Sequence, residues 1–466
     1  MTATVTEHDL SALRAGFSGD LLVPGSPGYD DARVLFNTMI DRRPALIAQC
    51  EGAADVAASI AFARARDLPL GVRGGGHGVA GAALVEDGVV VDLRRTNQVD
   101  VDAAARTVRV AGGATMADLD RACAPYGLMT TGGRVSTTGV GGFALGGGTG
   151  WFDRKFGLAA DNLVAVELVT AAGEAVVASE TENPELFWAL HGGGGNFGVA
   201  TAFTFALHEL STVCAALLMF PAAEGPRVAR AFRDFLAVAP DEVGGGFFYL
   251  TAPAEDWVPT ELHGVLSTLM LLVYAGPEEQ ARPVLEPVLT LGQVGEYVAE
   301  LPYADLQCML DDPPGYRNHW SAEHLTAFPD EAVDVFCARA SELIVPSPSV
   351  HVLFPQGGAV SRGPSHWPIP WRTAAWVAHP FAMWSDPAQD ERTRKWARAV
   401  REDLRQWSAG AVYLNFIGEE GPDRLLAGLG AANVRRLANV KAEWDPANLF
   451  RSNHNIRPEQ AAGQLI

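Results

Sequence analysis

The chain has 466 residues, of which 48% are apolar and 19% charged, and its formal net charge is -20. This composition is typical of a globular protein, and the negative charge disfavours nucleic acid and acidic membrane surfaces as partners. We expect two or three domains, because one domain usually has about 100–200 residues.

Neither a membrane span nor an export signal is expected, because no run of about 20 apolar residues occurs and the first ten residues are polar. The five cysteines are far apart and form no CxxC pair, so the sequence predicts neither a metal site nor a disulfide framework. Buried free thiols in a reducing compartment are the favoured interpretation, which predicts a cytoplasmic location.

The first two hundred residues alternate between short apolar runs and stretches with helical spacing of apolar residues. They predict strands at 44–50, 70–73, 89–93, 107–111 and 199–207, helices at 53–66, 116–126 and 185–191, and a hairpin of 162–170 with 175–178.

From about Ser211 the pattern changes to longer apolar runs separated by charged helical stretches. We predict strands at 215–221, 246–252, 266–274, 350–358 and 371–384, helices at 228–237, 277–289 and 390–407, and a last helix within 433–456. This alternation favours an antiparallel sheet backed by helices.

Glycines gather in three clusters in the first two hundred residues, which suggests backbone wrapped around a large ligand. In the first, 71–78, a strand enters Gly74–Gly76 and His77, where successive amides can bind a pyrophosphate. A tight turn with an incidental exposed histidine is the alternative. The second, 139–150, has too many glycines to predict a packed helix or strand.

The third cluster, 192–198, matches GxGxxG, but we reject a Rossmann site there. That fingerprint needs a strand before it and a helix after it, and here the predicted order is reversed. The loop can still contact a cofactor.

Together these segments resemble the flavin oxidoreductases of the vanillyl-alcohol oxidase type, in the branch that includes berberine bridge enzyme. The resemblance rests on the sequences PALIAQC, GVRGGGHGVAG, the glycine run through Gly150, WFDRKFGLAADNL, ENPELFWALHGGGGNFGVAT and the tail Lys441–Ile456. Within that branch, the sequence pattern of this chain most resembles that of the bacterial biosynthetic group that includes the flavin monooxygenase of enterocin assembly.

The resemblance implies a bilobal α+β fold of the PCMH type. A FAD-binding domain would comprise 1–208 and 413–466, and a substrate domain with an antiparallel sheet would comprise 209–412. His77 matches the family's histidine that bonds the flavin 8α-methyl carbon. Many relatives add a cysteinyl link at the position of Val135, so a single covalent link is expected here.

Further cofactor-binding residues follow from the same segments. They are Arg73, Gly74, Gly75, Gly76, Gly78, Val135, Thr138, Gly139, Gly141, Gly142, Gly146, Gly147, Gly148, Gly198, Val199, Asn453 and Asn455.

The candidates for the catalytic base or its helper come from two segments of the chain. Relatives often carry the base or its helper on YxNY, and this chain keeps Tyr413 and Asn415 but has Phe416 at the second aromatic position. Tyr249, on a predicted substrate-domain strand, is a further catalytic candidate; a core tyrosine is the alternative for Tyr413.

The cavity candidates from the strand that faces the flavin in relatives are Phe354, Gln356 and His351. Phe354 replaces the polar group before the proline and Gln356 an aromatic one, so the carboxylate base of berberine bridge enzyme has no counterpart. His351 has the opposite strand parity to Phe354. Phe143 and Trp151 also shape the predicted cavity, which favours a flat or apolar substrate such as a phenol or polyketide.

The predicted activity is oxidation of a small organic substrate by hydride transfer to flavin N5, with O2 as reoxidant. A flavin monooxygenase in a biosynthetic pathway is the second possibility, with Thr138 compatible with an oxygen site. A non-catalytic sequestering protein is the third. The pairs His319–Trp320 and His366–Trp367 are expected in loops at the surface or rim, and the oligomeric state is left open.

Overall fold

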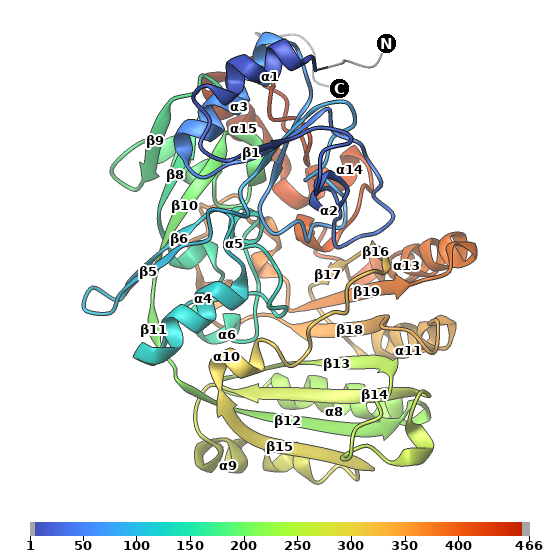
Figure 1. Cartoon of the computed structure of the whole chain (residues 1–466). Helices are drawn as coiled ribbons and strands as arrows, with labels where there is room; N and C mark the ends of the chain where they lie inside the picture. The colour runs from blue at the N-terminus through green and yellow to red at the C-terminus, as the bar shows by residue number, and fades with distance from the viewer. Residues whose placement is uncertain (1–4, 459–466) are drawn as a thin grey trace.

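The computed structural model describes residues 5–458 of the chain (Figure 1). Two smaller sheets and the C-terminal helices form one lobe, and one large sheet with its helices forms the other. This confirms the predicted α+β class. Within the described residues, no helix combines the length and apolar character needed to cross a bilayer.

The first sheet has the strand order β1-β2-β4-β3. Its strands are β1 (Asp20–Leu22), β2 (Leu46–Gln49), β3 (Leu70–Arg73) and β4 (Val89–Asp92). β4 pairs in parallel with both β2 and β3, and the helix α3 (Ala53–Ala65) connects β2 to β3. Buried parallel strands read as continuous apolar runs, which is why these segments were predictable. The short helices α1 (Glu7–Arg14) and α2 (Tyr29–Ala32) precede and follow β1.

The second sheet is antiparallel, with the order β5-β6-β10-β8-β9. Its strands are β5 (Val99–Asp102), β6 (Thr107–Ala111), β8 (Leu163–Val169), β9 (Ala175–Ser179) and β10 (Val199–Ala206). The expected hairpin is β8 with β9. The helices α4 (Met116–Cys123), α6 (Asp153–Phe156) and α7 (Pro184–Ala189) connect these strands.

The second glycine cluster contains a helix, so the expectation that it could form none is wrong. α5 (Val140–Leu145) lies inside it. A Cβ on Gly141 would approach the Gly112 carbonyl oxygen to 3.2 Å, so glycine lets this short helix pack closely on its neighbours. The close packing offsets the poor helix propensity of glycine.

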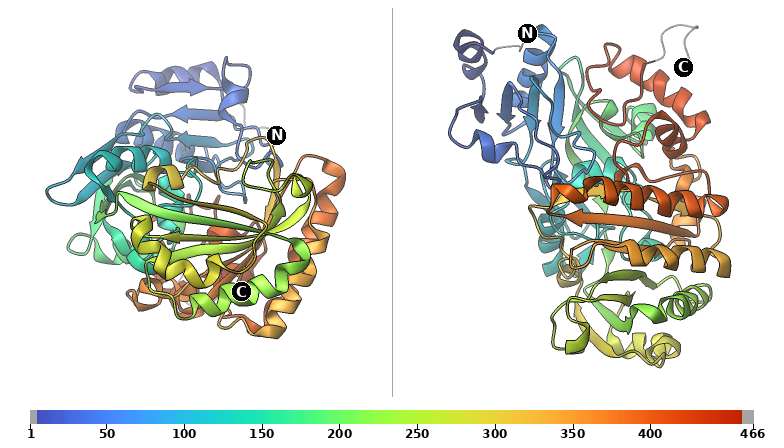
Figure 2. Two further views of the ribbon diagram at one scale, coloured as in Figure 1. Left: turned by 90° about the horizontal axis from the view of Figure 1, so that it is seen from below. Right: turned by 90° about the vertical axis from the view of Figure 1, so that its right-hand side faces the viewer.

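The large sheet has the order β15-β12-β14-β13-β18-β19-β16, with β17 also pairing with β19. Its strands are β12 (Thr212–Pro221), β13 (Val243–Thr251), β14 (Leu266–Tyr274), β15 (Gly295–Pro302), β16 (Arg317–Trp320), β17 (Glu323–Leu325), β18 (Val350–Pro355) and β19 (Trp376–Trp384). Side chains from one face pack in a core with helices α8 (Gly225–Leu236), α9 (Glu278–Leu289), α11 (Asp330–Ala338) and α13 (Asp390–Leu404). Figure 2 shows α13 running alongside β19.

The chain returns to the first lobe through α14 (Pro422–Leu429) and α15 (Ala431–Trp444). We propose the expected division into two domains, with the first boundary moved to lie between β11 (His208–Glu209) and β12. Both residues of β11 pair with β7 (Leu128–Met129) of the first lobe, so a boundary at 208/209 would divide a paired strand.

All five cysteines are free, and four of them are buried as expected. Cys308 is exposed, which corrects the expectation for that residue.

Candidate active site

One cavity of about 1050 Å³ lies between the two lobes. Its wall includes residues of all three glycine clusters, one face of the large sheet and the C-terminal tail. Sites for drug-sized ligands usually measure about 300–1,000 Å³, so this cavity has room for a large cofactor together with a small substrate.

Two of the glycine clusters touch backbone to backbone at Gly75 and Gly139. A Cβ on Gly75 would lie 2.5 Å from the Gly139 amide nitrogen, and one on Gly139 would lie 2.3 Å from that of Gly75. Only glycine fits at such a contact. At Gly142, Gly194 and Gly195, by contrast, a Cβ would meet no protein atom within 4 Å, so these residues leave the cavity wall open.

Most of the predicted cofactor residues line this cavity. They are Gly74, Gly75, Gly76, His77, Gly78, Val135, Thr138, Gly139, Gly141, Gly142, Gly146, Gly198 and Asn453. Residues of the loop 192–198 also line the cavity. The loop has a helix before it and a strand after it, which is the reverse of the order in a Rossmann site.

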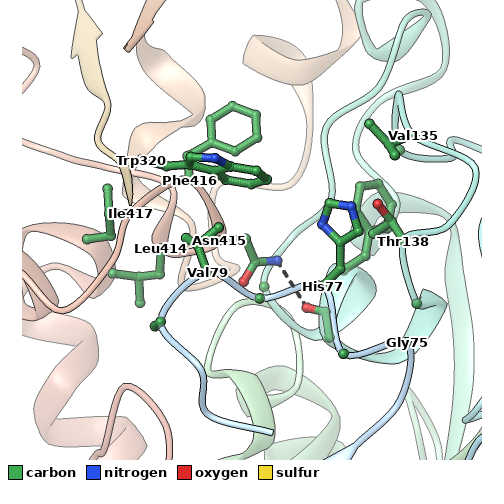
Figure 3. A pocket seen from close by; sticks show the side chains of 18 of the residues that line it. Gly75, His77, Val79, Val135, Thr138, Trp320, Leu414, Asn415, Phe416 and Ile417 are labelled. Carbon is green, nitrogen blue, oxygen red and sulfur yellow. Dashed lines mark hydrogen bonds between the residues drawn. The ribbon is translucent and has the colours of Figure 1, made fainter. Parts of the chain in front are cut away.

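The half-buried imidazole of His77 lies against Phe36, with ring centroids 3.9 Å apart and an angle of 14° between the planes. Its Nε2 atom is buried and has no hydrogen-bond partner. Burial lowers the His77 pKa to about 4, so the ring is neutral at pH 7 and carries a lone pair. Figure 3 shows His77 beside Thr138 and Val135, across the cavity from Leu414 and Ile417.

Tyr413 and Asn415 lie together on this wall. Asn415 Nδ2 donates to Tyr413 Oη at 2.9 Å and to the Gly142 carbonyl at 3.0 Å. A Cβ on Gly146 would lie 2.4 Å from the same amide nitrogen, so that glycine makes room for Asn415. Burial raises the Tyr413 pKa above its ordinary value, and the phenol keeps its proton at neutral pH.

The C-terminal tail is tied to the third glycine cluster. Asn453 Nδ2 donates to the Gly195 carbonyl at 3.1 Å, and its Oδ1 is buried without a partner. Asn196 donates to the His454 carbonyl at 3.1 Å. Asn453 and His454 thereby reach the cavity, whereas Asn455 is not among its lining residues.

The large sheet presents an aromatic and aliphatic face to the cavity. Phe354 lies edge-to-face with Phe248 at 5.8 Å and with Trp151 at 6.4 Å, and all three line the cavity. Phe143 also lines it. The predictions that Phe354, Phe143 and Trp151 shape the cavity agree with this placement.

Tyr249 and His351 lie on the opposite face of the sheet, so their assignment to the active site is corrected. Tyr249 on β13 is paired with His351 on β18. Tyr249 is next to Phe248, and His351 is three residues before Phe354, so each has the opposite strand parity to its cavity-facing neighbour. Both are buried in the core with the helices, where His351 stacks on Phe336 at 3.7 Å. Successive residues of a strand point to opposite faces, which explains both placements.

Several other predicted residues are near the cavity but do not line it. The Arg73 guanidinium donates to the carbonyls of Ala32 and Val34, and so braces the preceding loop. Gly147 and Gly148 adopt positive φ angles of 121° and 77°. Val199 is fully buried in the core of the first sheet. Gln356 is buried just beyond β18, where its carbonyl accepts from Arg154.

The cavity residues that were not predicted as site residues include Trp320, His379 and Arg134. Trp320, expected at the surface or rim, lies on β16 and packs 4.1 Å from Phe381. His379 is the polar residue within an apolar strand, and its pairing with Val352 places it on the cavity face. Arg134 is a lone charge in a glycine-rich stretch. The signals in the sequence that could have identified these residues were strand parity and the isolated charge of Arg134.

Burial also lowers the His379 pKa to about 4. Its Nδ1 lies 2.7 Å from the Ser321 carbonyl, which makes Nδ1 the protonated nitrogen and leaves the lone pair on the unpartnered Nε2. The ring stacks on Phe416 at 4.4 Å.

Comparisons with known proteins bear on the cofactor and the fold. Residues 44–179 match a family model described as FAD binding domain, and residues 412–457 match one described as berberine and berberine like. The (R)-6-hydroxynicotine oxidase of Paenarthrobacter nicotinovorans is 30% identical over 485 residues, covering 95% of this chain and 97% of that protein. A FAD-linked oxidoreductase of Dictyostelium discoideum is 29% identical, covering 91% of each chain.

Solved structures show the same fold. The crystal structure of 6-hydroxy-D-nicotine oxidase from Arthrobacter nicotinovorans has a TM-score of 0.83 at 28% identity, covering 95% of this chain and 98% of that chain. A berberine-bridge-enzyme-like protein of Physcomitrella patens has a TM-score of 0.86 at 22% identity, covering 97% and 99%. The expected likeness to the enterocin enzyme stays a prediction. The chain belongs to the berberine-bridge-enzyme-like family of FAD-linked oxidoreductases and is a FAD-dependent enzyme.

Proposed function

We propose that this enzyme holds FAD through a single covalent bond to His77 and oxidises a small, flat or apolar organic molecule, with O2 as electron acceptor. The neutral His77 ring at the cavity wall, with its buried and unpartnered Nε2, carries the proposal. The names of the relatives, which include oxidases, support the reaction class.

The residues around the cavity fit FAD. The open backbone at Gly142, Gly194 and Gly195 gives an extended ligand close access to main-chain amides. The unpartnered Asn453 Oδ1 offers an acceptor there. When bound, FAD supplies a two-electron acceptor at N5 that O2 can reoxidise.

His77 is suited to form the bond to the flavin 8α carbon because its ring is neutral. A protonated imidazole has no free lone pair, and the low pKa prevents protonation at pH 7. Val135 lines the same cavity and has no sulfur, so the second link of many relatives is chemically excluded at that position.

We assign Tyr413 and Asn415 to the substrate's reacting oxygen or nitrogen. Asn415 donates to Tyr413 Oη, so the phenolic proton is free to point to another acceptor. A hydroxyl in that position orients the substrate group that loses its proton. The base itself is not assigned, since Phe416 and Phe354 replace polar groups that relatives use.

Thr138, on the wall beside His77, keeps the monooxygenase alternative open. Turnover under 18O-labelled O2 separates the two reactions. Label in the organic product would identify a monooxygenase, and label only in peroxide would identify an oxidase.

Acid denaturation of the purified protein, followed by intact-mass measurement, tests the covalent bond. We expect a yellow pellet and a mass increase of one FAD, both lost in His77→Ala and kept in the control His366→Ala, which changes an exposed histidine. A colourless pellet with FAD in the supernatant would overturn the covalent assignment. A protein without any flavin would favour a sequestering role.

A further inference from the structure

We propose that Arg134 binds an anionic oxygen of the substrate, so the enzyme takes a flat or apolar molecule that carries a carboxylate, phenolate or enolate. This inference rests on the proposed function, because it concerns the substrate end of the same cavity.

The guanidinium of Arg134 is fixed where the two lobes meet. Its Nη2 donates to the Gly150 carbonyl at 2.6 Å. The central carbon lies 4.3 Å from the ring centroid of Phe354, on the large sheet, and 5.2 Å from that of Trp151. An arginine stacked on aromatic rings presents its donors in a fixed plane, so its position is defined before a ligand binds.

The charge of Arg134 is incompletely compensated by the protein. The nearest carboxylate, Asp153, has its Oδ2 3.7 Å from Nη2, beyond hydrogen-bond distance. That carboxylate accepts instead from the Thr149 hydroxyl and the Gly150 amide. Nη1 donates to the Thr149 carbonyl at 3.4 Å and Nη2 to the Thr149 hydroxyl at 3.3 Å, both long contacts, and the buried Nε has no partner. Because the contacts with Thr149 are long, an anionic ligand oxygen in the cavity would complete the hydrogen bonding of the Nη atoms and compensate the charge.

The sheet face around Arg134 supplies no charge of its own. Apart from His379, the side chains of this face that line the cavity are aliphatic, aromatic or hydroxyl-bearing, and they include Leu217, Phe248, Val352 and Phe354. His379 is neutral at pH 7 because of its lowered pKa. An apolar ligand body can therefore lie on this face while one anionic group pairs with Arg134.

Binding to the purified, flavin-loaded enzyme tests the inference with two probes, 2-naphthoate and its uncharged, non-oxidisable amide 2-naphthamide. They share the same rings and differ in the anionic group, and flavin absorbance changes report binding without turnover. We expect naphthoate to bind at least about tenfold more tightly, since only its carboxylate forms a charge-assisted hydrogen bond with Arg134. Arg134→Met should abolish this preference, and Arg134→Lys should keep part of it.

Equal binding of the two probes by the wild type would overturn the inference, whether or not the variants fold. So would an Arg134→Met enzyme that keeps its naphthoate affinity but has an altered flavin spectrum, since that result places Arg134 against the cofactor. The intact mass of the same samples reports the His77 bond separately. If the covalent bond to His77 is absent, the affinities of the two probes can therefore still be compared on enzyme that holds dissociable FAD.

Discussion

The Nζ atom of Lys441 lies 2.7 Å from Oδ2 of Asp445, and both side chains are fully buried. Lys441 also donates to the Asn196 and Phe450 carbonyls at 2.6 and 2.9 Å. Asp445 accepts from the amides of Leu449 and Phe450, both at 2.8 Å. This ion pair joins the tail that carries Asn453 to the third glycine cluster, and so completes the proposed cofactor end of the cavity.

Lys441→Met should therefore destabilise the protein and reduce its FAD content. It leaves the Asp445 carboxylate buried without a cation, which typically costs about 3–5 kcal/mol. Urea unfolding measures the cost, and flavin absorbance per protein measures the loading. Lys441→Met/Asp445→Asn should regain part of the stability.

The matched control is Arg398→Met, which removes an exposed ion pair with Glu391 and should cost less than about 1 kcal/mol. If Lys441→Met were no more harmful than this control, the buried pair would not hold the tail.

Gly142→Ala and Gly75→Ala should separate cofactor binding from folding. The added methyl at Gly142 meets no protein atom within 4 Å, so we expect a normal melting temperature and lower FAD content. The methyl at Gly75 would collide with the Gly139 backbone, so both properties should fall. Gly52→Ala, also without a contact within 4 Å but away from the cavity, is the control. Full flavin loading of Gly142→Ala would place the cofactor elsewhere.

Tyr413→Phe should keep covalent FAD but slow substrate oxidation about 10²-fold, the lower range for loss of a group that assists proton transfer. Rapid mixing with substrate under anaerobic conditions measures flavin reduction directly. Tyr249→Phe, on the opposite face of the sheet, should leave that rate unchanged. A larger effect of Tyr249→Phe would contradict the assignment.

His351 should make folding sensitive to acid. Burial lowers its pKa from 6.5 to about 3 in the folded state. Between these values the unfolded chain binds a proton that the folded protein does not, so stability falls as the pH falls, by about 1.4 kcal/mol per unit. Relative to His351→Asn, which does not titrate, the wild type should lose about 2 kcal/mol between pH 7.5 and pH 5. If the difference in the free energy of unfolding between the wild type and His351→Asn were the same at both pH values, this prediction would be contradicted.

Much of the fold could be predicted from sequence because local patterns determine it. β3 and β14 have the predicted bounds, since apolar runs ended by glycine, proline or charge define buried strands. α5 could not be predicted, because close packing beside Gly112 overrides the helix propensity of its glycines.

The sequence by itself determined the family and the residues of the glycine clusters, including His77, because their spacing is local in the chain. The tertiary structure decided which side chains face the cavity. Strand pairing placed His379 on the cavity side and His351 and Tyr249 on the other, and lobe packing brought Arg134 against Phe354. Tyr249 and His351, like Arg134 and Phe354, are more than a hundred positions apart, so the geometry of these contacts depends on the packing of sheets and not on any local pattern.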